Sequence, residues 1–325
     1  LAGLGNPQEN QQFIHVTGTN GKGSVVKMVS CLIEELGLKV GRYTSPFIMR
    51  FNERIVINQE PISDADLVTV TQQIQTTVAQ IQTTDPEFEV TEFEWITAMM
   101  FLYFKQQQVD VAVVEVGIGG LYDSTNVLTP LISVITSIGL DHQALLGKTF
   151  AEIATQKAGI IKAGHPVVIG QLPKEALTVV EETATRLNSS LAISGCDFSR
   201  AAVKTLPTSG QQITFQNDAV TERQIQIPLM GDYQIENAAV ALQVFWCYLQ
   251  LTQQKLEVRD IKRALKRVNW PGRFEKINDE PLIILDGAHN PEGEAQMVQT
   301  TRHQFKNREI NQICRPLADK QHEEN

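Results

Sequence analysis

A glycine-rich segment at residues 18–24 combines one lysine and one serine with small, flexible neighbours. The apolar residues 13–16 before it are typical of a buried strand, and the apolar spacing over residues 25–36 is typical of a helix. In a turn from strand to helix, backbone N–H groups can wrap a phosphate, and the helix N-terminus adds partial positive charge. Lys22 can neutralise the phosphates, and the Ser24 hydroxyl can reach a magnesium ion. The segment therefore predicts a nucleoside triphosphate site, although Gly23 separates Lys22 from Ser24 and breaks the strict phosphate-loop spacing. Its residues are Gly18, Thr19, Asn20, Gly21, Lys22, Gly23 and Ser24.

Two further polar residues stand at the ends of predicted buried strands. Glu115 interrupts the apolar run at residues 109–116, and His142 follows the strand predicted over residues 131–136. Side chains at the carboxyl ends of parallel strands face the crevice where open α/β sheets bind ligands. A carboxylate suits magnesium, and a neutral imidazole can also bind a metal. Each residue also has a structural interpretation. Glu115 could be a buried acid with a structural partner, and His142 could be an ordinary packed histidine.

Other charged residues favour a phosphate-binding cleft when taken together. Lys157 lies on a predicted helix, although alone it would be interpreted as a solvated surface cation. Arg273 lies in a predicted linker at residues 269–273, where its guanidinium could clamp phosphate oxygens across a domain cleft or form an interdomain salt bridge. Asp286 and His289 follow a strand predicted over residues 282–286, and we expect both to face the same cleft.

The length of 325 residues favours two domains. Strands and helices alternate up to about residue 190, which predicts a doubly wound α/β domain with a parallel sheet. Residues 191–228 change to short alternating strands, and residues 231–251 then predict a helix. We place the domains at residues 1–270 and 271–325, and we expect the strand at residues 282–286 to be buried.

The composition argues against a nucleic-acid-binding protein, a disulfide or zinc framework, and a membrane-spanning protein. Charged residues make up 20% of the chain, and the net charge of −9 comes with no concentrated basic run, so we expect no nucleic acid partner. The four cysteines, which include Cys314, are far apart and indicate reduced thiols rather than disulfides or a zinc site. No apolar run reaches the length of a membrane span. We therefore expect a cytoplasmic protein with no membrane contact.

Several sequence blocks, in this order, resemble the folylpolyglutamate synthase and dihydrofolate synthase family of the Mur ligase superfamily. The loop indicates the superfamily, whereas the Thr-Ser-Pro and Asn-Glu-Arg-Ile blocks indicate the folate branch. The matching blocks are GTNGKGS at 18–24, YTSP at 43–46, FNERI at 51–55, EVGIGG at 115–120, DSTN at 123–126, LDH at 140–142, QKAGIIK at 156–162, WPGR at 270–273 and DGAHNP at 286–291.

The resemblance implies a monomeric ATP-dependent ligase with a P-loop Mur ligase fold. The enzyme would join glutamate to the γ-carboxylate of a reduced folate, or to dihydropteroate, through an acyl phosphate. By the same resemblance the glycine-rich loop holds ATP, and Mg²⁺ is bound by Ser24, Ser45, Glu115 and His142. Lys157 corresponds to a lysine that the family carbamylates. Asn237, Arg273 and Asp286 correspond to ATP contacts, and His289 to the glutamate side; Lys157, His142, Asp286 and His289 are the expected catalytic residues.

The chain departs from the family pattern at both ends, and we expect it to be truncated there. Residues 274–325 number 52, fewer than the hundred or so that a stable α/β domain usually has. Residues 308–316 are polar where an apolar strand is expected, and Leu121 and Tyr122 replace a more polar pair. We therefore expect ATP binding by the first domain but slow formation of glutamyl product. The alternatives are a nucleotide-binding remnant without turnover and another Mur-type amide ligase acting on a nucleotide-linked peptide precursor.

Overall fold

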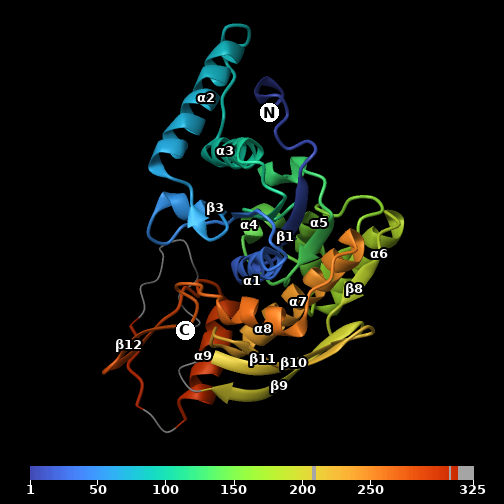
Figure 1. Ribbon diagram of the computed structural model, residues 1–325, viewed down its shortest axis with the longest axis vertical. Helices are drawn as coiled ribbons and strands as arrows, with labels where there is room; N and C mark the ends of the chain where they lie inside the picture. Colours follow the sequence, from blue (N-terminus) through green and yellow to red (C-terminus); the bar gives the residue numbers. More distant parts are fainter. Residues whose placement is uncertain (207–209, 307–308, 314–325) are drawn as a thin grey trace.

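The computed structural model describes residues 1–206, 210–306 and 309–313, and its centre is an eight-stranded mixed sheet (Figure 1). The strand order is β4-β3-β2-β5-β1-β6-β7-β8, in which β2, β5, β1, β6, β7 and β8 run parallel and β3 and β4 pair antiparallel at one edge. The strands are β1 (Gln12–Thr17), β2 (Val40–Tyr43), β3 (Ile55–Ile57), β4 (Glu60–Pro61), β5 (Val111–Glu115), β6 (Ile132–Ile135), β7 (Val167–Ile169) and β8 (Leu191–Ile193).

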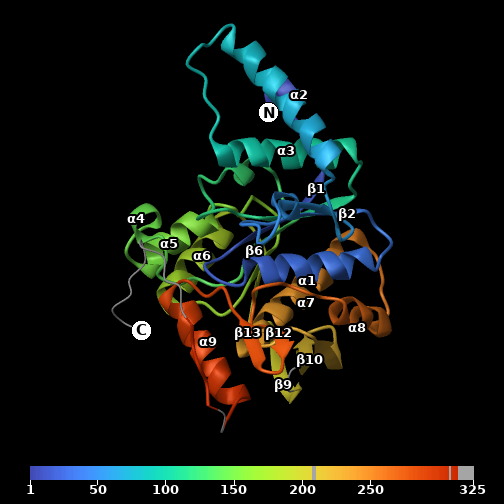
Figure 2. The ribbon, with the colours of Figure 1, turned by 90° about the vertical axis from the view of Figure 1, so that its left-hand side faces the viewer.

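Helices cover both faces of this sheet, which confirms the doubly wound α/β class. Successive strand residues point to opposite faces, so Ile14 and Val16 of β1 pack towards α1 and α7, whereas Phe13 packs towards α3. Figure 2 shows α3 on one side of the sheet and α1, then α7, on the other. Helices α5 and α6 cover β6 and β7 on the face opposite α1. These helices are α1 (Lys22–Glu34), α2 (Asp64–Gln82), α3 (Glu92–Gln106), α4 (Gln143–Leu146), α5 (Phe150–Ala158), α6 (Lys174–Arg186) and α7 (Asp232–Thr252).

Side-chain caps begin several of these helices. Ser63 and Thr91 cap α2 and α3 by accepting a hydrogen bond from the amide three residues on, and Thr149 caps α5 in the same way. In α3 and α5 a glutamate at the third position closes a capping box. These contacts satisfy N-terminal amides that would otherwise have no partner in the helix.

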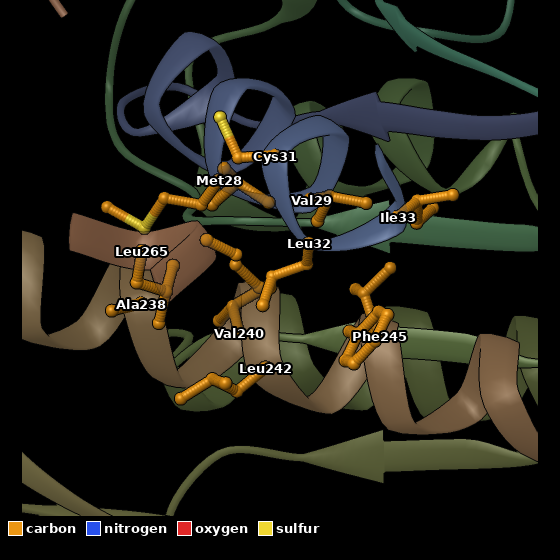
Figure 3. Close-up of a cluster of buried hydrophobic side chains, with 14 of the residues drawn as sticks. Met28, Val29, Cys31, Leu32, Ile33, Ala238, Val240, Leu242, Phe245 and Leu265 are labelled. Carbon is orange, nitrogen blue, oxygen red and sulfur yellow. The ribbon is translucent and has the colours of Figure 1, made fainter. Parts of the chain in front are cut away.

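The largest apolar core lies between α1 and α7. Figure 3 shows Met28, Val29 and Leu32 of α1 facing Val240 and Phe245 of α7, and all five side chains are fully buried. Burial of one such side chain stabilises a fold by about 1.5–3 kcal/mol. A three-stranded antiparallel sheet then covers the outer side of α7 (Figure 1), formed by β9 (Phe198–Leu206), β10 (Gly210–Asn217) and β11 (Thr221–Ile227). The core therefore fixes α1, whose N-terminus follows the glycine-rich loop.

The structure corrects two expectations about strands. Leu191–Ile193 forms β8 at the edge of the main parallel sheet, not part of the alternating segment that follows it. The strand predicted over residues 282–286 is β13 (Leu282–Leu285), and it pairs antiparallel with β12 (Glu275–Asp279) in a two-stranded sheet. Ile283 and Leu285 are 42% and 47% exposed, so the prediction of a buried strand was wrong.

The predicted domain boundary at residue 270 falls between α8 (Val258–Lys266) and β12, where the chain has neither helix nor strand. The division into two domains stays a prediction. Helix α9 (Pro291–Gln304) follows β13. Cys314, residues 317–320 and most of the polar stretch at 308–316 lie outside the described residues. In the part of the chain that the structure describes, no helix is long and apolar enough to cross a membrane.

Candidate active site

A cavity of about 560 Å³ lies at the carboxyl ends of the central strands, and every residue proposed above for the site contributes to its lining. These residues come from loops after β1, β2, β5 and β6, from α1, α5 and α7, from the segment before β12 and from the turn after β13. Convergence of strand ends at one edge of the sheet explains why residues so distant in sequence meet. They are Gly18, Thr19, Asn20, Gly21, Lys22, Gly23, Ser24, Ser45, Glu115, His142, Lys157, Asn237, Arg273, Asp286 and His289.

The glycine-rich loop is fastened to the end of β6. The amides of Thr19 and Asn20 donate to the carbonyl oxygen and hydroxyl of Ser137, both at 2.9 Å. The Thr136 hydroxyl donates to the carbonyl of Asn20 at 2.6 Å. The amides of α1's first turn have no acceptor inside the helix and remain available to a phosphate.

Lys22 reaches back over this loop. Its Nζ donates to the carbonyls of Gly18 and Thr19 at 3.0 and 3.2 Å. Burial lowers the pKa of Lys22, and the carboxylates of Glu115 and Asp141 partly oppose that effect. The ammonium group therefore stands inside the loop, where it would meet an anionic ligand.

At two positions of the loop, neighbouring side chains lie so close to the backbone that only glycine fits. Gly21 has a φ of 85°, and a Cβ there would lie 2.3 Å from Oδ1 of Asn237. A Cβ on Gly23 would lie 2.8 Å from the ring of Trp270, which also stacks on Arg42. The glycine that breaks the strict loop spacing is therefore the contact point for the segment between α8 and β12.

Glu115 and Ser45 meet at the neighbouring strand ends. The Ser45 amide donates to Oε2 of Glu115 at 3.2 Å, and Glu115 is only 4% exposed. Burial raises the pKa of Glu115 to about 7, although Lys22 and this hydrogen bond oppose the rise. A divalent cation would compensate such a buried carboxylate. Among the described residues, no three His, Cys, Asp or Glu side chains form a metal site on their own, so phosphates and water would have to complete the coordination.

Lys157 lies in the last turn of helix α5, lines the cavity and is 3% exposed. Burial and the nearby charge of Lys22 together lower its pKa to about 7, against the opposing effect of Asp141 and Asp123. This lowering favours the neutral amine, which is the nucleophilic form. The residue is not the solvated surface cation that the sequence alone would suggest.

His142 lies in the left-handed region, with a φ of 50°, directly before α4. Its amide donates to Oδ1 of Asp141 at 2.8 Å, and its Nε2 lies 3.9 Å from the other carboxylate oxygen. His142 contributes to the lining of the cavity from this uncommon backbone conformation. Whether His142, Ser45 or Ser24 binds a metal stays a prediction.

The residues after the linker complete the opposite wall. Asp286 accepts hydrogen bonds from the amides of Phe274 and Ala288, each at 2.8 Å, and from the hydroxyl of Tyr233 at 3.2 Å. Asp286 therefore organises the turn that presents His289, whatever its further role. Arg273 is close enough to Lys22 and Glu115 to affect the pKa of each, which places its charge at the phosphate loop.

The sequence arguments missed several residues that line the site or hold its phosphate loop in place. Asn290, the N-cap of α9, exchanges hydrogen bonds with Asn20 of the loop and donates to Asp141 at 3.0 Å. Oε2 of Glu292 accepts from Asn20 at 3.1 Å. The available signal was the Asn-Pro pair of the DGAHNP block, because asparagine before proline is typical of a helix start. Tyr233, at the start of α7, gave no signal of its own.

Comparison with known proteins shows which family the chain belongs to. The Mur ligase middle domain matches residues 16–245, which defines the chain as a protein of the Mur ligase class. The folylpolyglutamate synthase of Lacticaseibacillus casei is 47% identical over 98% of this chain and 74% of its own length. The dihydrofolate synthase/folylpolyglutamate synthase of Bacillus subtilis is 38% identical with the same coverage. A solved FPGS–AMPPCP–folate complex superposes with a TM-score of 0.92 at 47% identity, covering 94% of this chain and 74% of that one.

The chain belongs to the folylpolyglutamate synthase and dihydrofolate synthase family of Mur ligases. The resemblance noted in the sequence is thereby confirmed. The particular roles assigned to site residues remain proposals.

Proposed function

We propose that this protein is an ATP-dependent ligase that adds glutamate to the γ-carboxylate of a reduced folate. The observation that carries the proposal is the single cavity in which the phosphate loop, buried Glu115 and Lys157, and the post-linker residues Arg273 and Asp286 meet. The similarity to a folylpolyglutamate synthase solved with AMPPCP and folate supports the same ligand classes.

The reaction has two displacements. An oxygen of the folate γ-carboxylate attacks the γ-phosphorus of ATP, the bond from phosphorus to the bridging oxygen breaks, and ADP leaves. The amine of glutamate then attacks the acyl carbon, phosphate leaves with the electrons of the C–O bond, and the amine releases a proton. Neither step needs a protein nucleophile, so positioning and charge compensation supply the catalysis.

The residues on different walls of the cavity would bind different parts of the substrates. The loop amides and Lys22 hold the phosphates, and Arg273 approaches them from the other wall. Asn237 contacts the loop at Gly21, where a nucleotide would pass between α7 and the segment around Asp286. His289, at the open side, is available to the incoming glutamate.

Magnesium fits the donor set of this cavity. The buried carboxylate of Glu115 has a raised pKa that a cation would lower, and the hydroxyls of Ser24 and Ser45 are hard oxygen ligands. His142 would complete the protein ligands. When bound, the ion would neutralise charge on the β- and γ-phosphates.

We also propose that Lys157 is carbamylated. The neutral amine nitrogen would attack the carbon of carbon dioxide, forming an N–C bond and releasing one proton. The product carries a negative charge, which would replace repulsion between Lys157 and Lys22 by attraction. Burial supports the proposal because it favours the amine form that reacts.

The test is incubation of the purified protein with MgATP, a reduced folate and glutamate, followed by mass spectrometry of the folate. A product one glutamyl residue heavier, with one phosphate released per product, is expected only when all three substrates are present. Phosphate release that does not depend on folate, with no heavier folate, would contradict the proposal. A glutamyl product from a nucleotide-linked peptide instead would assign another Mur-type ligase.

A further inference from the structure

A chain of buried polar side chains connects strand β1 to the loop at residues 117–123. His15 and Thr125 are both fully buried, and Nε2 of His15 lies 2.8 Å from Oγ1 of Thr125. Thr125 donates from this hydroxyl to Oδ1 of Asp123 at 2.5 Å, and its amide donates to the same oxygen at 3.0 Å. The other Asp123 oxygen accepts the amide of Ile118 at 3.0 Å.

The direction of these hydrogen bonds defines the tautomer of His15. Thr125 has one hydroxyl proton, which it donates to the Asp123 carboxylate, so His15 must be the donor in the remaining contact. Burial lowers the pKa of His15 to about 3, helped by Lys162, so the imidazole is neutral near pH 7 with its proton on Nε2. Nδ1 has no partner among the described residues. The contribution of His15 is therefore its hydrogen bond to Thr125, because an apolar side chain at position 15 could not donate one.

The same motif fastens the far end of the loop to the helix that carries Lys157. Nδ2 of Asn126 donates to the carbonyls of Leu121 and Gly159 at 3.0 and 3.1 Å. The amide of Leu121 also donates to the carbonyl of Gln156 at 2.7 Å. The DSTN block thus connects the loop to both β1 and the end of α5.

The loop in question is a wall of the cavity. Gly117, Ile118 and Gly119 contribute to its lining beside Glu115 and Lys157. Two residues after His15 on the same strand, the Thr17 hydroxyl donates to the carbonyl of Gly119 at 2.5 Å. Strand β1 therefore fixes the phosphate loop and the 117–119 wall relative to one another.

We propose that His15 and Thr125 are positioning residues, which hold Asp123 so that the 117–119 wall keeps its place opposite the phosphate loop. Their effect on catalysis rests on the proposed function, because the acceptor carboxylate would have to lie between that wall and the γ-phosphate. A displacement of about 1 Å at such a position can cost roughly a hundredfold in rate.

The first test measures the loop itself and needs no turnover. Thr125→Val keeps the shape and removes the hydroxyl, so amide hydrogen exchange of residues 117–122 should become at least tenfold faster, about 1.4 kcal/mol. Thr125→Ser should retain most of the protection. Thr97→Val, the same change at another buried threonine, should leave the loop unchanged. Unchanged loop exchange in Thr125→Val, or an equal increase in Thr97→Val, would overturn the proposal.

Variants of His15 provide a second test if Thr125→Val folds poorly. His15→Leu removes the donor and should accelerate exchange of the loop, whereas His15→Gln keeps an N–H donor and should do so less. The double variant with Thr125→Val should exchange no faster than the single variants, because both act on one chain of contacts. Additive increases in the exchange rate would contradict the view that His15 and Thr125 act through one chain of hydrogen bonds.

The kinetic test separates positioning from general destabilisation. Thr125→Val should lower kcat for glutamyl transfer by tenfold or more, with the KM for ATP within twofold of the parent value. An equal loss of nucleotide affinity would assign a merely structural role. If the parent protein forms no glutamyl product, the proposed function fails, while the exchange experiment still decides the positioning proposal.

Discussion

Replacement of Lys22 by methionine tests the phosphate loop, because methionine keeps most of the length of the side chain and removes its charge. In the structure Nζ of Lys22 lies within the loop, bonded to the carbonyls of Gly18 and Thr19. The change therefore removes one cation from the place where the phosphates of ATP would lie. Nucleotide affinity should fall, while the fold should persist.

The expected loss of nucleotide affinity is estimated from the attraction between Lys22 and the phosphates and from the effects that oppose it. A unit charge pair at about 4 Å contributes about 4 kcal/mol at an effective dielectric constant near 20, which is an upper bound. Desolvation of the phosphates and the counter-charge of Glu115 reduce it. We expect a loss of about 1.4–2.7 kcal/mol, or roughly ten- to a hundredfold in Kd. Stability should change little, because removal of a buried charge offsets the loss of two hydrogen bonds of about 1 kcal/mol each.

Titration calorimetry with MgAMPPCP measures the effect, and thermal unfolding checks the fold. Lys27→Met is the matched control, since Lys27 lies on the same helix, is buried, has a lowered pKa and lies outside the cavity lining. Its affinity for the nucleotide should stay within twofold of the parent value. Equal affinities for the parent and Lys22→Met proteins, with the fold intact, would refute the assignment of the loop.

Three other predictions address the cavity. Lys157→Ala should lower glutamyl transfer at least a hundredfold, with partial rescue by acetate, and full activity of the variant would exclude a catalytic role for this side chain. Labelled bicarbonate should give a carbamate signal in the parent alone, and no signal in the parent would contradict the modification. The raised pKa of Glu115 means that the folded protein binds a proton more tightly than the unfolded chain, so its stability falls as pH rises from about 4.5 towards 7. Glu115→Gln in EDTA should therefore be about 1–3 kcal/mol more stable than the parent at pH 8 and no more stable at pH 4, and equal denaturation midpoints at pH 8 would contradict this. Gly23→Ala would place a methyl group against the ring of Trp270, so it should weaken MgAMPPCP binding at least tenfold and change the tryptophan fluorescence; parent-like values for both would refute the contact.

The sequence was informative where local chemistry decides the structure. Apolar runs with a glycine-rich turn between them predicted β1 and α1, because each pattern lies within one element or in the turn that joins the two. The rule that parallel strands end at one edge placed Glu115 and His142 in the same cavity. Those inferences need only spacing within one element and a general rule of topology.

Features that depend on packing between distant segments could not be predicted. The contact of Gly23 with Trp270 and the hydrogen bonds from Asn20 to Asn290 join residues about 250 or more positions apart. Three apolar residues such as Leu191–Ile193 fit a parallel edge strand as well as an antiparallel one, since so short a run carries no period. The exposure of Ile283 likewise follows from the two-stranded pairing of β13 rather than from its own composition.

Transfer of a heavy oxygen isotope from the folate to phosphate tests the proposed reaction most directly. A folate whose γ-carboxylate carries the heavy isotope is incubated with the protein, MgATP and glutamate, and the released phosphate is analysed by mass spectrometry. An acyl phosphate intermediate predicts one heavy oxygen atom in each phosphate that accompanies a glutamyl product. Glutamyl product with unlabelled phosphate, or phosphate labelled only when the water is heavy, would contradict attack of the folate carboxylate on ATP in this cavity.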